Sequence, residues 1–403
     1  MSFTFKPSEN LSRVAPSATI AMSRRAKDKA ACGLDVINLS AGEPDFATPE
    51  HICAAARDAI AAGKTGYTVV DGITELKQAA VSKFARDNDL AFTTDQIHIS
   101  PGGKASIFNA FMATLNPDDE VIIPAPCWVS YPEMVKLCGA KPVIVPTTAA
   151  SDFKITQEQL SSAITPNTKW LCLNSPNNPT GAVINNAEYG ALAEVLRAKT
   201  HVMVMTDDIY EHIIYEPGGF ATLLNAAPDL ADRTLIVNGV SKAYAMTGWR
   251  IGVAAGPRPL IAAMGKVISQ TTSNACSISQ WASVAALSGV QEYLVDRREN
   301  FRARRDVVAS AINHTDRLSC MVPGGAFYIF ADCSQTFGMT SAGGALISDD
   351  LDFCNAVLDE ALVALVPGSA FHAPGHFRLS YASSREELDK ALTRLGKFCA
   401  DLV

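Results

Sequence analysis

The chain lacks any run of 18 consecutive apolar residues, the length that a membrane-spanning helix needs. Its N-terminus, Met-Ser-Phe-Thr-Phe-Lys, lacks the apolar stretch of a secretory signal peptide. It also has no internal repeat and no low-complexity tract. We therefore expect a soluble, cytoplasmic protein rather than a membrane protein or a secreted one.

An excess of positive charge is also missing. The formal net charge is −7, and the lysines and arginines are scattered rather than grouped in long blocks. This pattern argues against nucleic acid or an anionic membrane as the main partner. The densest basic cluster contains Arg302, Arg304 and Arg305, and we expect it on the exposed side of a long helix.

The ten cysteines form no Cys-x-x-Cys pair. Many lie inside apolar runs, where cysteine behaves as a small hydrophobic residue. Examples are Cys138, Cys172, Cys354 and Cys399. The pattern is typical of a reducing compartment. It predicts neither a disulfide framework nor a metal site.

At 403 residues, the chain is too long for one ordinary core and suits two domains that share an active-site cleft. Hydrophobic residues make up 48% and charged residues 19%, so a large core is feasible. From Ile97 onward, strand and helix patterns alternate, and most strands are continuously apolar. This is typical of an α/β sheet covered by helices on both faces. The expected strands are 97–100, 120–124, 142–145, 169–174, 201–206, 235–238 and 251–255.

The composition changes after Gly289. Residues 292–313 predict one long charged helix, a bridge to a second domain. Strand patterns follow at 325–331, 363–367 and 377–382, and a closing helix is expected at 384–403.

The stretch 239–252 reads Gly-Val-Ser-Lys-Ala-Tyr-Ala-Met-Thr-Gly-Trp-Arg-Ile-Gly and lies between two apolar runs of strand type. Lys242 is therefore expected in a loop at the end of a sheet, where burial disfavours the ammonium ion and lowers the pKa. A neutral amine forms imines with carbonyl groups, which a surface lysine at pH 7 rarely does. Arg250 offers a permanent cation to a phosphate. Together they indicate pyridoxal phosphate (PLP), although an isolated Ser-Lys pair is more often a solvated surface site.

The whole stretch resembles the PLP-lysine signature of class I and II aminotransferases. The resemblance extends over nearly the whole chain, which resembles most the aspartate aminotransferases of bacterial subgroup Iβ. It implies PLP fold type I, with a mixed seven-stranded sheet covered by helices in a large domain, residues 49–291. A smaller α+β domain would combine residues 1–48 and 292–403. The resemblance also implies a homodimer with shared active sites, in which Tyr67 reaches the phosphate of the neighbouring subunit.

The segment 100–106, Ser-Pro-Gly-Gly-Lys-Ala-Ser, follows an expected strand and precedes an amphipathic helix. Glycines let the backbone approach a phosphate closely, and a helix N-terminus favours an anion. From the residues alone, a plain tight turn is an equal alternative. The resemblance implies a phosphate site formed by the backbone of Gly102, Gly103 and Lys104. Ser241 and Arg250 are further predicted cofactor-binding residues.

Four other candidates follow strand ends. Asn178 lies in Asn-Ser-Pro-Asn-Asn-Pro-Thr-Gly, where two prolines and a glycine fix an unusual backbone. Asp207 ends an apolar strand, and a buried carboxylate needs a partner, which is either a structural cap or ion pair or a cofactor. The resemblance implies that Asp207 pairs with the pyridine nitrogen of PLP and that Tyr210 bonds its ring oxygen. It also implies that Asn178 bonds the ring oxygen and the substrate, and that Trp128, otherwise a core residue, lies against the ring.

Arg378 lies on an alternating strand, and its planar guanidinium suits a carboxylate, although a cross-domain salt bridge is the alternative. The resemblance implies that Arg378 and the backbone of Gly42 hold the α-carboxylate of an amino acid. Lys104 would recognise the distal carboxylate of a dicarboxylic substrate. Trp128 and Asn178 also count as substrate-binding residues. Arg13, in the N-terminal arm, is either a second cation for that carboxylate or a solvated residue.

These residues predict ping-pong transamination of amino acids and 2-oxo acids, with aspartate and 2-oxoglutarate as the first hypothesis. Lys242 would be the base, with Asp207 and Tyr210 as the other catalytic residues. The alternative is a prephenate, aromatic or other amino-acid aminotransferase, or a lyase on the same scaffold. A transcription regulator would carry a DNA-binding domain ahead of the resemblance, and we expect none. An inactive binding module would have lost Lys242, Asp207 or Arg378, and all three are present.

Overall fold

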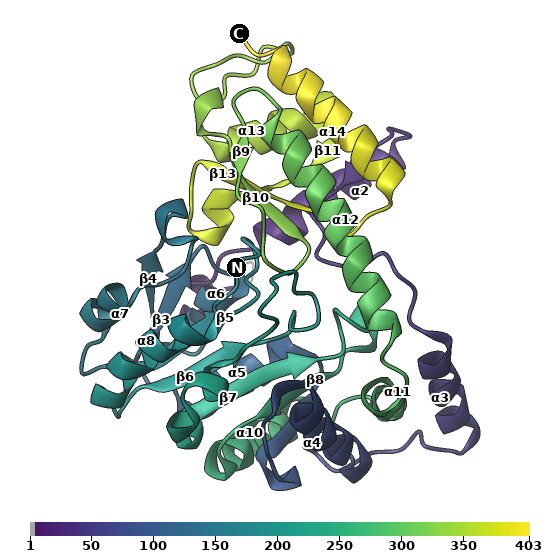
Figure 1. The fold of residues 1–403 in the computed structure, drawn as a ribbon, viewed down its shortest axis with the longest axis vertical. Coiled ribbons are helices and arrows are strands. Elements are labelled where there is room, and N and C mark those ends of the chain that lie inside the picture. Colours follow the sequence, from purple (N-terminus) through teal and green to yellow (C-terminus); the bar gives the residue numbers. More distant parts are fainter. Residues whose placement is uncertain (1–4) are drawn as a thin grey trace, which may run out of the picture.

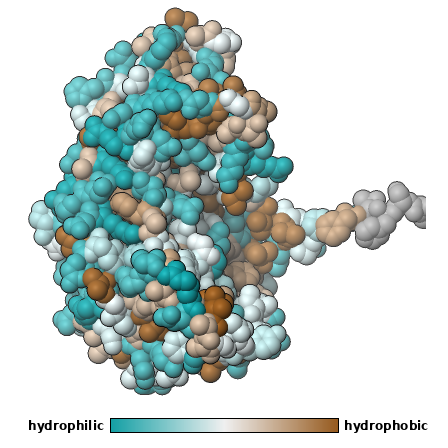
Figure 2. All heavy atoms as spheres, turned by 90° about the vertical axis from the view of Figure 1, so that its right-hand side faces the viewer, coloured by the Kyte–Doolittle hydropathy of each residue, from teal (hydrophilic) through white to brown (hydrophobic). Residues whose placement is uncertain are grey.

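The computed structural model describes residues 5–403 (Figure 1). The segment that begins at residue 5 extends away from the body of the molecule (Figure 2). The larger part is built on a seven-stranded sheet in the order β2-β8-β7-β6-β5-β3-β4. Strand β8 runs antiparallel to both of its neighbours and the other pairs are parallel, so the predicted mixed sheet is confirmed. The strands are β2 (Ile97–Ser100), β3 (Glu120–Ala125), β4 (Lys141–Pro146), β5 (Thr168–Asn174), β6 (Met203–Asp207), β7 (Thr234–Gly239) and β8 (Gly252–Ala255).

Side chains along each strand alternate between the two faces of this sheet. On β5, Leu171 and Leu173 pack into one hydrophobic cluster, whereas Trp170 and Cys172 pack into another. Because both faces are covered, successive positions are buried, which explains the continuously apolar strand patterns. All seven strands lie where the sequence predicts them, and their ends differ by at most two residues.

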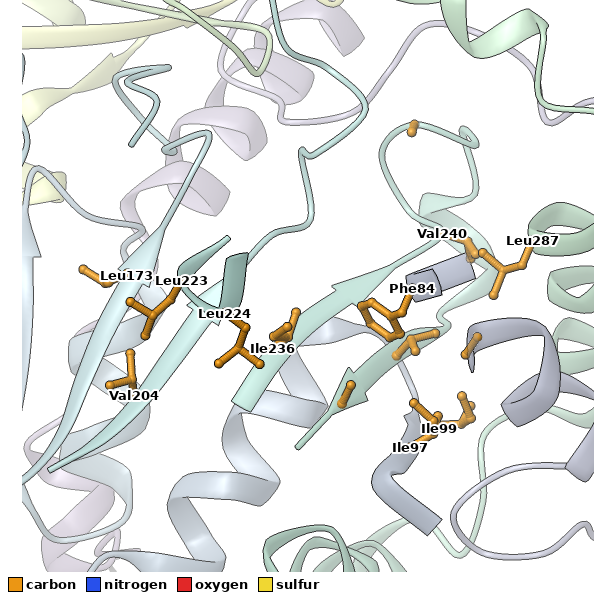
Figure 3. Close-up of a cluster of buried hydrophobic side chains, with 14 of the residues drawn as sticks. Phe84, Ile97, Ile99, Leu173, Val204, Leu223, Leu224, Ile236, Val240 and Leu287 are labelled. Carbon is orange, nitrogen blue, oxygen red and sulfur yellow. The ribbon is translucent and has the colours of Figure 1, made fainter. Parts of the chain in front are cut away.

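Helices cover both faces. On one face, Leu223 lies beside Val204, Leu224 beside Ile236 and Leu287 beside Val240, all in one hydrophobic cluster (Figure 3). The helices of this face are α3 (Glu50–Ala61), α4 (Thr74–Asn88), α7 (Gln157–Ala163), α8 (Asn186–Ala198), α9 (Leu223–Ala226) and α11 (Ser277–Ser288). The opposite face is covered by α5 (Gly103–Thr114), α6 (Ser130–Leu137) and α10 (Arg258–Thr271). The sequence pattern predicts helices at 49–62 and 189–198 and an apolar stripe at 107, 111 and 115, which correspond to α3, α8 and α5. It gives no clear signal for α4, α6, α10 or α11.

The smaller part combines segments from both ends of the chain. Met22 and Ile37 pack in the same cluster as Phe353 and Leu388. An antiparallel sheet has the order β12-β13-β10-β9, and β1 pairs in parallel with β11. The strands are β1 (Ile37–Asn38), β9 (Ser319–Cys320), β10 (Tyr328–Asp332), β11 (Val363–Ala364), β12 (Val366–Pro367) and β13 (His376–Ser380). The helices are α2 (Ala18–Ala31), α13 (Asp350–Ala356) and α14 (Arg385–Ala400), preceded in the arm by α1 (Glu9–Ser12).

Helix α12 (Tyr293–Asn313) runs from the larger part to the smaller one (Figure 1). The expectation that its arginines are exposed is wrong for two of the three. The side chain of Arg304 is 11% exposed and its Nη1 lies 2.8 Å from Oδ1 of Asp45. The guanidinium of Arg305 lies 4.7 Å from the ring centroid of Tyr215. These contacts fasten α12 to its neighbours. The domain boundaries themselves, 49–291 against 1–48 and 292–403, stay a prediction.

Three compositional features have a structural counterpart. The cysteines are all free thiols. Within residues 5–403, no helix is both long enough and apolar enough to span a membrane. Asp87, Glu211 and His212 come close together, but the ammonium of Lys83 forms a buried ion pair with Glu211 at this point. A lysine therefore already supplies the positive charge there.

Candidate active site

A pocket of about 400 Å³ opens at the carboxyl ends of the parallel strands, between the two parts of the molecule. Ligands of open α/β sheets bind at this edge, and pocket volumes of this order suit small molecules. Eleven predicted residues line it: Gly42, Gly103, Lys104, Trp128, Asn178, Asp207, Tyr210, Ser241, Lys242, Arg250 and Arg378. Residues that are hundreds of positions apart in the sequence therefore face one cavity.

Lys242 lies in the turn between the antiparallel strands β7 and β8. Its Nζ donates a hydrogen bond of 2.6 Å to the carbonyl oxygen of Gly42. Burial lowers the pKa of Lys242 to about 8, with repulsion from Arg378 as the next cause. An amine with this pKa is partly neutral at physiological pH and is therefore a competent nucleophile and base.

Asp207 ends β6 and is buried at the floor of the pocket. The hydroxyl of Tyr131 donates a hydrogen bond of 2.6 Å to Oδ2, and the N–H of Ile209 donates one of 3.4 Å to Oδ1. Burial raises the pKa of Asp207 to about 6, although these hydrogen bonds and Lys242 act in the opposite direction. No ion pair with Asp207 is formed in the described part of the chain. The carboxylate is thus prepared for a cation inside the pocket.

The loop before α5 and the residue Arg250 form a cradle. Gly102 has a φ of +89°, and a Cβ atom there would collide with the guanidinium of Arg250. A Cβ on Gly252 would collide with the backbone of Gly102 and Gly103. Helix α5 begins at Gly103, so its free N–H groups point toward Arg250 and the pocket. This arrangement suits an anion such as a phosphate.

Arg378, on β13, is only 2% exposed. Its Nη1 donates to Oδ1 of Asn178 at 2.9 Å, its Nη2 donates to the carbonyl oxygen of Ser40 at 2.6 Å, and its Nε has no partner. No carboxylate within residues 5–403 forms an ion pair with it. A buried cation with spare donors is costly unless an anion joins it, so the pocket is built to accept a carboxylate.

Comparison with known proteins identifies the family. The family model for aminotransferases of class I and II matches residues 34–395. The chain is a class I and II aminotransferase. It is 54% identical to the aspartate/prephenate aminotransferase of Cereibacter sphaeroides, over 98% of this chain and 99% of that one. It is 50% identical to an aspartate aminotransferase of Rhizobium meliloti, over 98% of this chain and 96% of that one.

Solved structures agree. The crystal structure of an aspartate aminotransferase from Rhizobium meliloti matches with a TM-score of 0.96 and 50% identity, over 99% of this chain and 100% of that one. The aspartate aminotransferase of Thermus thermophilus with maleate matches with a TM-score of 0.91 and 41% identity, over 98% of this chain and 100% of that one.

As a member of this family, the aminotransferase is a PLP-dependent enzyme. The pocket fits that group on independent grounds. Lys242 offers an amine of lowered pKa, and Asp207 offers a buried carboxylate that lacks a cation. At Gly102 the guanidinium of Arg250 packs directly against the backbone at the start of α5, so a permanent cation and free N–H groups lie together where a phosphate can bind. Lys242 can bind the aldehyde of PLP, Asp207 can pair with its ring nitrogen, and the loop beside Arg250 can bind its phosphate.

Lys104 and Trp128 lie together at the mouth of the aminotransferase pocket. The Nζ of Lys104 lies 4.9 Å from the ring centroid of Trp128, in a cation–π contact. Burial lowers the pKa of Lys104, and repulsion from Arg250 adds to the effect. This ammonium therefore faces the cavity as a further cation, distinct from Arg250 and Arg378.

Three predicted residues do not line the pocket. Gly102 borders it only through its contact with Arg250. Tyr67 is 94% exposed. Arg13 is exposed at the end of α1, whereas Ser17, Thr19 and Ile20 at the start of α2 line the pocket instead.

Sequence reasoning missed several residues that face the same cavity. Tyr131 donates to Asp207, and Tyr328 shares a hydrogen bond of 2.8 Å with Tyr210. Glu43 accepts a hydrogen bond from Thr247 across the mouth. Thr19 and Ile20, in the first turn of α2, also face the cavity. The sequence does offer a reason to consider Tyr131, because it lies three residues after Trp128 in the same segment. No local pattern points to Tyr328.

Proposed function

We propose that this aminotransferase transfers the amino group of aspartate to 2-oxoglutarate by a ping-pong mechanism. One observation carries the proposal: a lysine with a pKa near 8 and a buried carboxylate without a cation line the same pocket as two cations, Arg378 and Lys104. Two cations suit a substrate with two carboxylates. Named aspartate aminotransferases at about half identity over the full chain support this choice.

In this proposal, each residue acts on a stated group. Lys242 would hold the aldehyde of PLP and, with its amine free, would accept the proton of the substrate's Cα at its Nζ. Asp207 keeps the ring nitrogen protonated, and Tyr210 donates to the ring oxygen. When bound, PLP supplies the electron sink that makes this proton acidic.

Further residues bind and orient. The N–H groups of Gly102, Gly103 and Lys104 bind the phosphate together with Ser241 and Arg250. Trp128 covers one face of the ring. Asn178, which already bonds Arg378, is shared between cofactor and substrate. The α-carboxylate binds Arg378 with help from Gly42, and Lys104 binds the distal carboxylate, with Arg13 proposed as an auxiliary cation.

Prephenate is the second candidate substrate. The relative at 54% identity is named an aspartate/prephenate aminotransferase. Prephenate also carries two carboxylates, so it suits the same pair of cations. An absorbance scan against aspartate, arogenate and the common amino acids distinguishes the donors, because each true donor changes the absorption of the bound cofactor.

The active unit is proposed to be a homodimer. Tyr67 is 94% exposed and Val69 is 64% exposed, an unusual exposure for large apolar side chains in one short segment. Phe5, near the N-terminus, adds a further apolar side chain that is 74% exposed. In a dimer, Tyr67 would reach the phosphate of the partner subunit. The free thiols suit a reducing compartment, and we place the enzyme in the cytoplasm.

Two measurements test the function. Borohydride reduction of the PLP-loaded protein followed by peptide mapping is expected to label Lys242. A protein that stays colourless after PLP is added, or a label on another lysine, contradicts the proposal. In a steady-state panel, Lys104→Ala is expected to raise the KM for aspartate about 10-fold or more, the loss of one charge-assisted hydrogen bond. Unchanged aspartate kinetics with damaged aromatic kinetics would contradict the dicarboxylate assignment.

A further inference from the structure

Tyr328 is a buried tyrosine of the pocket that the proposed function leaves without a role. It lies on β10 and is 1% exposed. Its hydroxyl oxygen lies 2.8 Å from the hydroxyl oxygen of Tyr210, and its ring centroid lies 4.5 Å from the guanidinium carbon of Arg378. It therefore contacts both a residue proposed for the cofactor and the residue proposed for the substrate's carboxylate.

Gly42 fixes the position of this hydroxyl. A Cβ atom on Gly42 would lie 2.6 Å from the hydroxyl oxygen of Tyr328, so the backbone of Gly42 packs directly against it. The same residue accepts the hydrogen bond from Nζ of Lys242. The hydroxyl consequently has little freedom to move away from Tyr210.

One of the two hydroxyl protons is not used in the hydrogen bond between Tyr210 and Tyr328. Two tyrosine hydroxyls carry two protons, and they share one hydrogen bond with each other. In the described part of the chain, neither hydroxyl forms a second hydrogen bond. One proton is therefore free, and because Tyr210 and Tyr328 both line the pocket, it is available to a bound ligand.

The neighbouring charges decide which tyrosine donates to the other. Burial raises the pKa of both hydroxyls, and Arg378 opposes this rise at both: it is the second-largest cause at Tyr328 but ranks behind burial and the effects of Tyr328 at Tyr210. For Tyr210, burial acts with the nearby Tyr328 and Asp207 to raise the pKa well above its usual range. The more acidic hydroxyl is the better donor. Tyr328 thus donates, and Tyr210 keeps a free proton.

We propose that Tyr328 is a positioning residue that donates its hydroxyl proton to Tyr210 and so directs the proton of Tyr210 toward the ring oxygen of PLP. The inference rests on the proposed function, in which Tyr210 bonds that oxygen. Tyr328 would thereby connect the substrate's side of the pocket to the cofactor's side, because Arg378, proposed to bind the carboxylate, also lies against the Tyr328 ring.

The test is a spectroscopic pH titration of the PLP-loaded protein. Hydrogen-bond donation stabilises the deprotonated form of the ring oxygen, so a weaker donor raises the apparent pKa of the cofactor's absorption band. Tyr328→Phe keeps the ring against Arg378 and removes only the hydroxyl. We expect it to raise this pKa by about 0.5 to 1 pH unit, the size of one hydrogen bond.

A double-mutant comparison separates positioning from general packing. Tyr210→Phe should raise the pKa of the band by itself. In that background, Tyr328→Phe is expected to change it by less than about 0.2 pH unit, because the group through which it acts is gone. Tyr215→Phe is the matched control: its hydroxyl is buried in the same cluster and bonds the carbonyl oxygen of Ala326, away from the pocket. It should leave the band unchanged.

Binding of maleate, a dicarboxylate that cannot react, completes the test. Tyr328→Phe should change its Kd by less than about twofold, since Arg378 and its partners remain. The positioning role is overturned if the absorption pKa does not move in Tyr328→Phe, whether or not the Kd for maleate weakens tenfold. It is also overturned if the two shifts add in the double variant. A wild-type protein that takes up no PLP would overturn the proposed function and this inference together, whereas an unmoved pKa in a loaded Tyr328→Phe variant overturns the inference alone.

Discussion

The two walls of the pocket are built in different ways. In the larger part, Asp207 ends one parallel strand and Lys242 follows the next one along the sheet. In the smaller part, the wall joins Gly42, Tyr328 and Arg378, which come from both ends of the chain. The first wall is thus set by the local order of strands in one sheet. The second depends on the packing of distant segments.

This difference suits two kinds of ligand. A sheet buried on both faces holds its strand ends rigidly, which favours a resident group. The smaller part meets the larger one through a few polar contacts at the pocket, such as Arg378 with Asn178 and Gly42 with Lys242. Such a wall suits a substrate that enters and leaves. Changes in the first wall should therefore affect the cofactor. Changes in the second should affect substrate binding, except at Tyr328, whose hydroxyl bonds Tyr210 on the cofactor's side.

The largest effect is expected from Lys242→Ala. Removing the amine removes the group that carries the proton of Cα, so kcat should fall by at least about 10²- to 10⁴-fold. Borohydride should no longer fix the cofactor covalently. Steady-state assays with aspartate and mass mapping measure both. Lys27→Ala, which removes an exposed lysine, is the control. A Lys242→Ala variant that keeps a tenth of the activity would refute the assignment of the first wall.

Arg378→Lys is the matching change in the second wall. A lysine keeps the charge but loses the planar fork, so one charge-assisted hydrogen bond to the carboxylate is lost. We expect the KM for aspartate to rise about 10- to 100-fold. The absorption of bound PLP should stay unchanged, as should both properties in the exposed control Arg24→Lys. Loss of PLP with an unchanged KM would show that the walls are not separable in this way.

Tyr131→Phe should have a smaller effect and only on the first wall. It removes the hydrogen bond of 2.6 Å that lowers the pKa of Asp207, which is about 6 in the cofactor-free protein. The pKa of Asp207 then rises, so protonation of the carboxylate, and with it the loss of activity on the acid side, begins at a higher pH. We expect a two- to tenfold drop in kcat at pH 7.

A pH profile of kcat for Tyr131→Phe checks this prediction. Tyr189→Phe is a matched control, because Tyr189 is fully buried but its hydroxyl has no hydrogen-bond partner. An acid limb that stays in place in Tyr131→Phe would mean that Asp207 does not depend on this hydroxyl.

The first wall was also the part that the sequence predicts best. Each parallel strand is a short apolar run that ends at the same edge of the sheet, so strand order places Asp207 and Lys242 there, while their roles come from the resemblance. Helices such as α4 and α11 gave weaker signals. Helix α4 buries polar residues such as Lys83 and Asn88, which interrupts an apolar stripe.

The second wall could not be predicted from local pattern. Strand β1 is two residues long and pairs with β11, so Ile37 lies opposite Val363. No periodicity in either segment encodes that pairing, which depends on long-range packing. The same reason explains why Tyr328 was missed and why Arg304 was expected in solvent: both meet their partners only after the distant segments have packed.

The smallest effect tests whether the two walls influence each other. In the cofactor-free protein, the ammonium of Lys242 is destabilised mainly by burial, and the carboxylate of Glu43 is among the groups that oppose this. Glu43→Gln removes that negative charge, so the pKa of Lys242 should fall further below about 8, by less than about one pH unit.

Reductive methylation of Lys242 across a pH series, read by mass spectrometry, gives the midpoint. Glu75→Gln, an exposed charge elsewhere, should leave the midpoint in place. A wild-type midpoint near that of an ordinary surface lysine would contradict the burial argument, whereas an upward shift in Glu43→Gln would mean that the second wall acts on Lys242 through contacts other than charge.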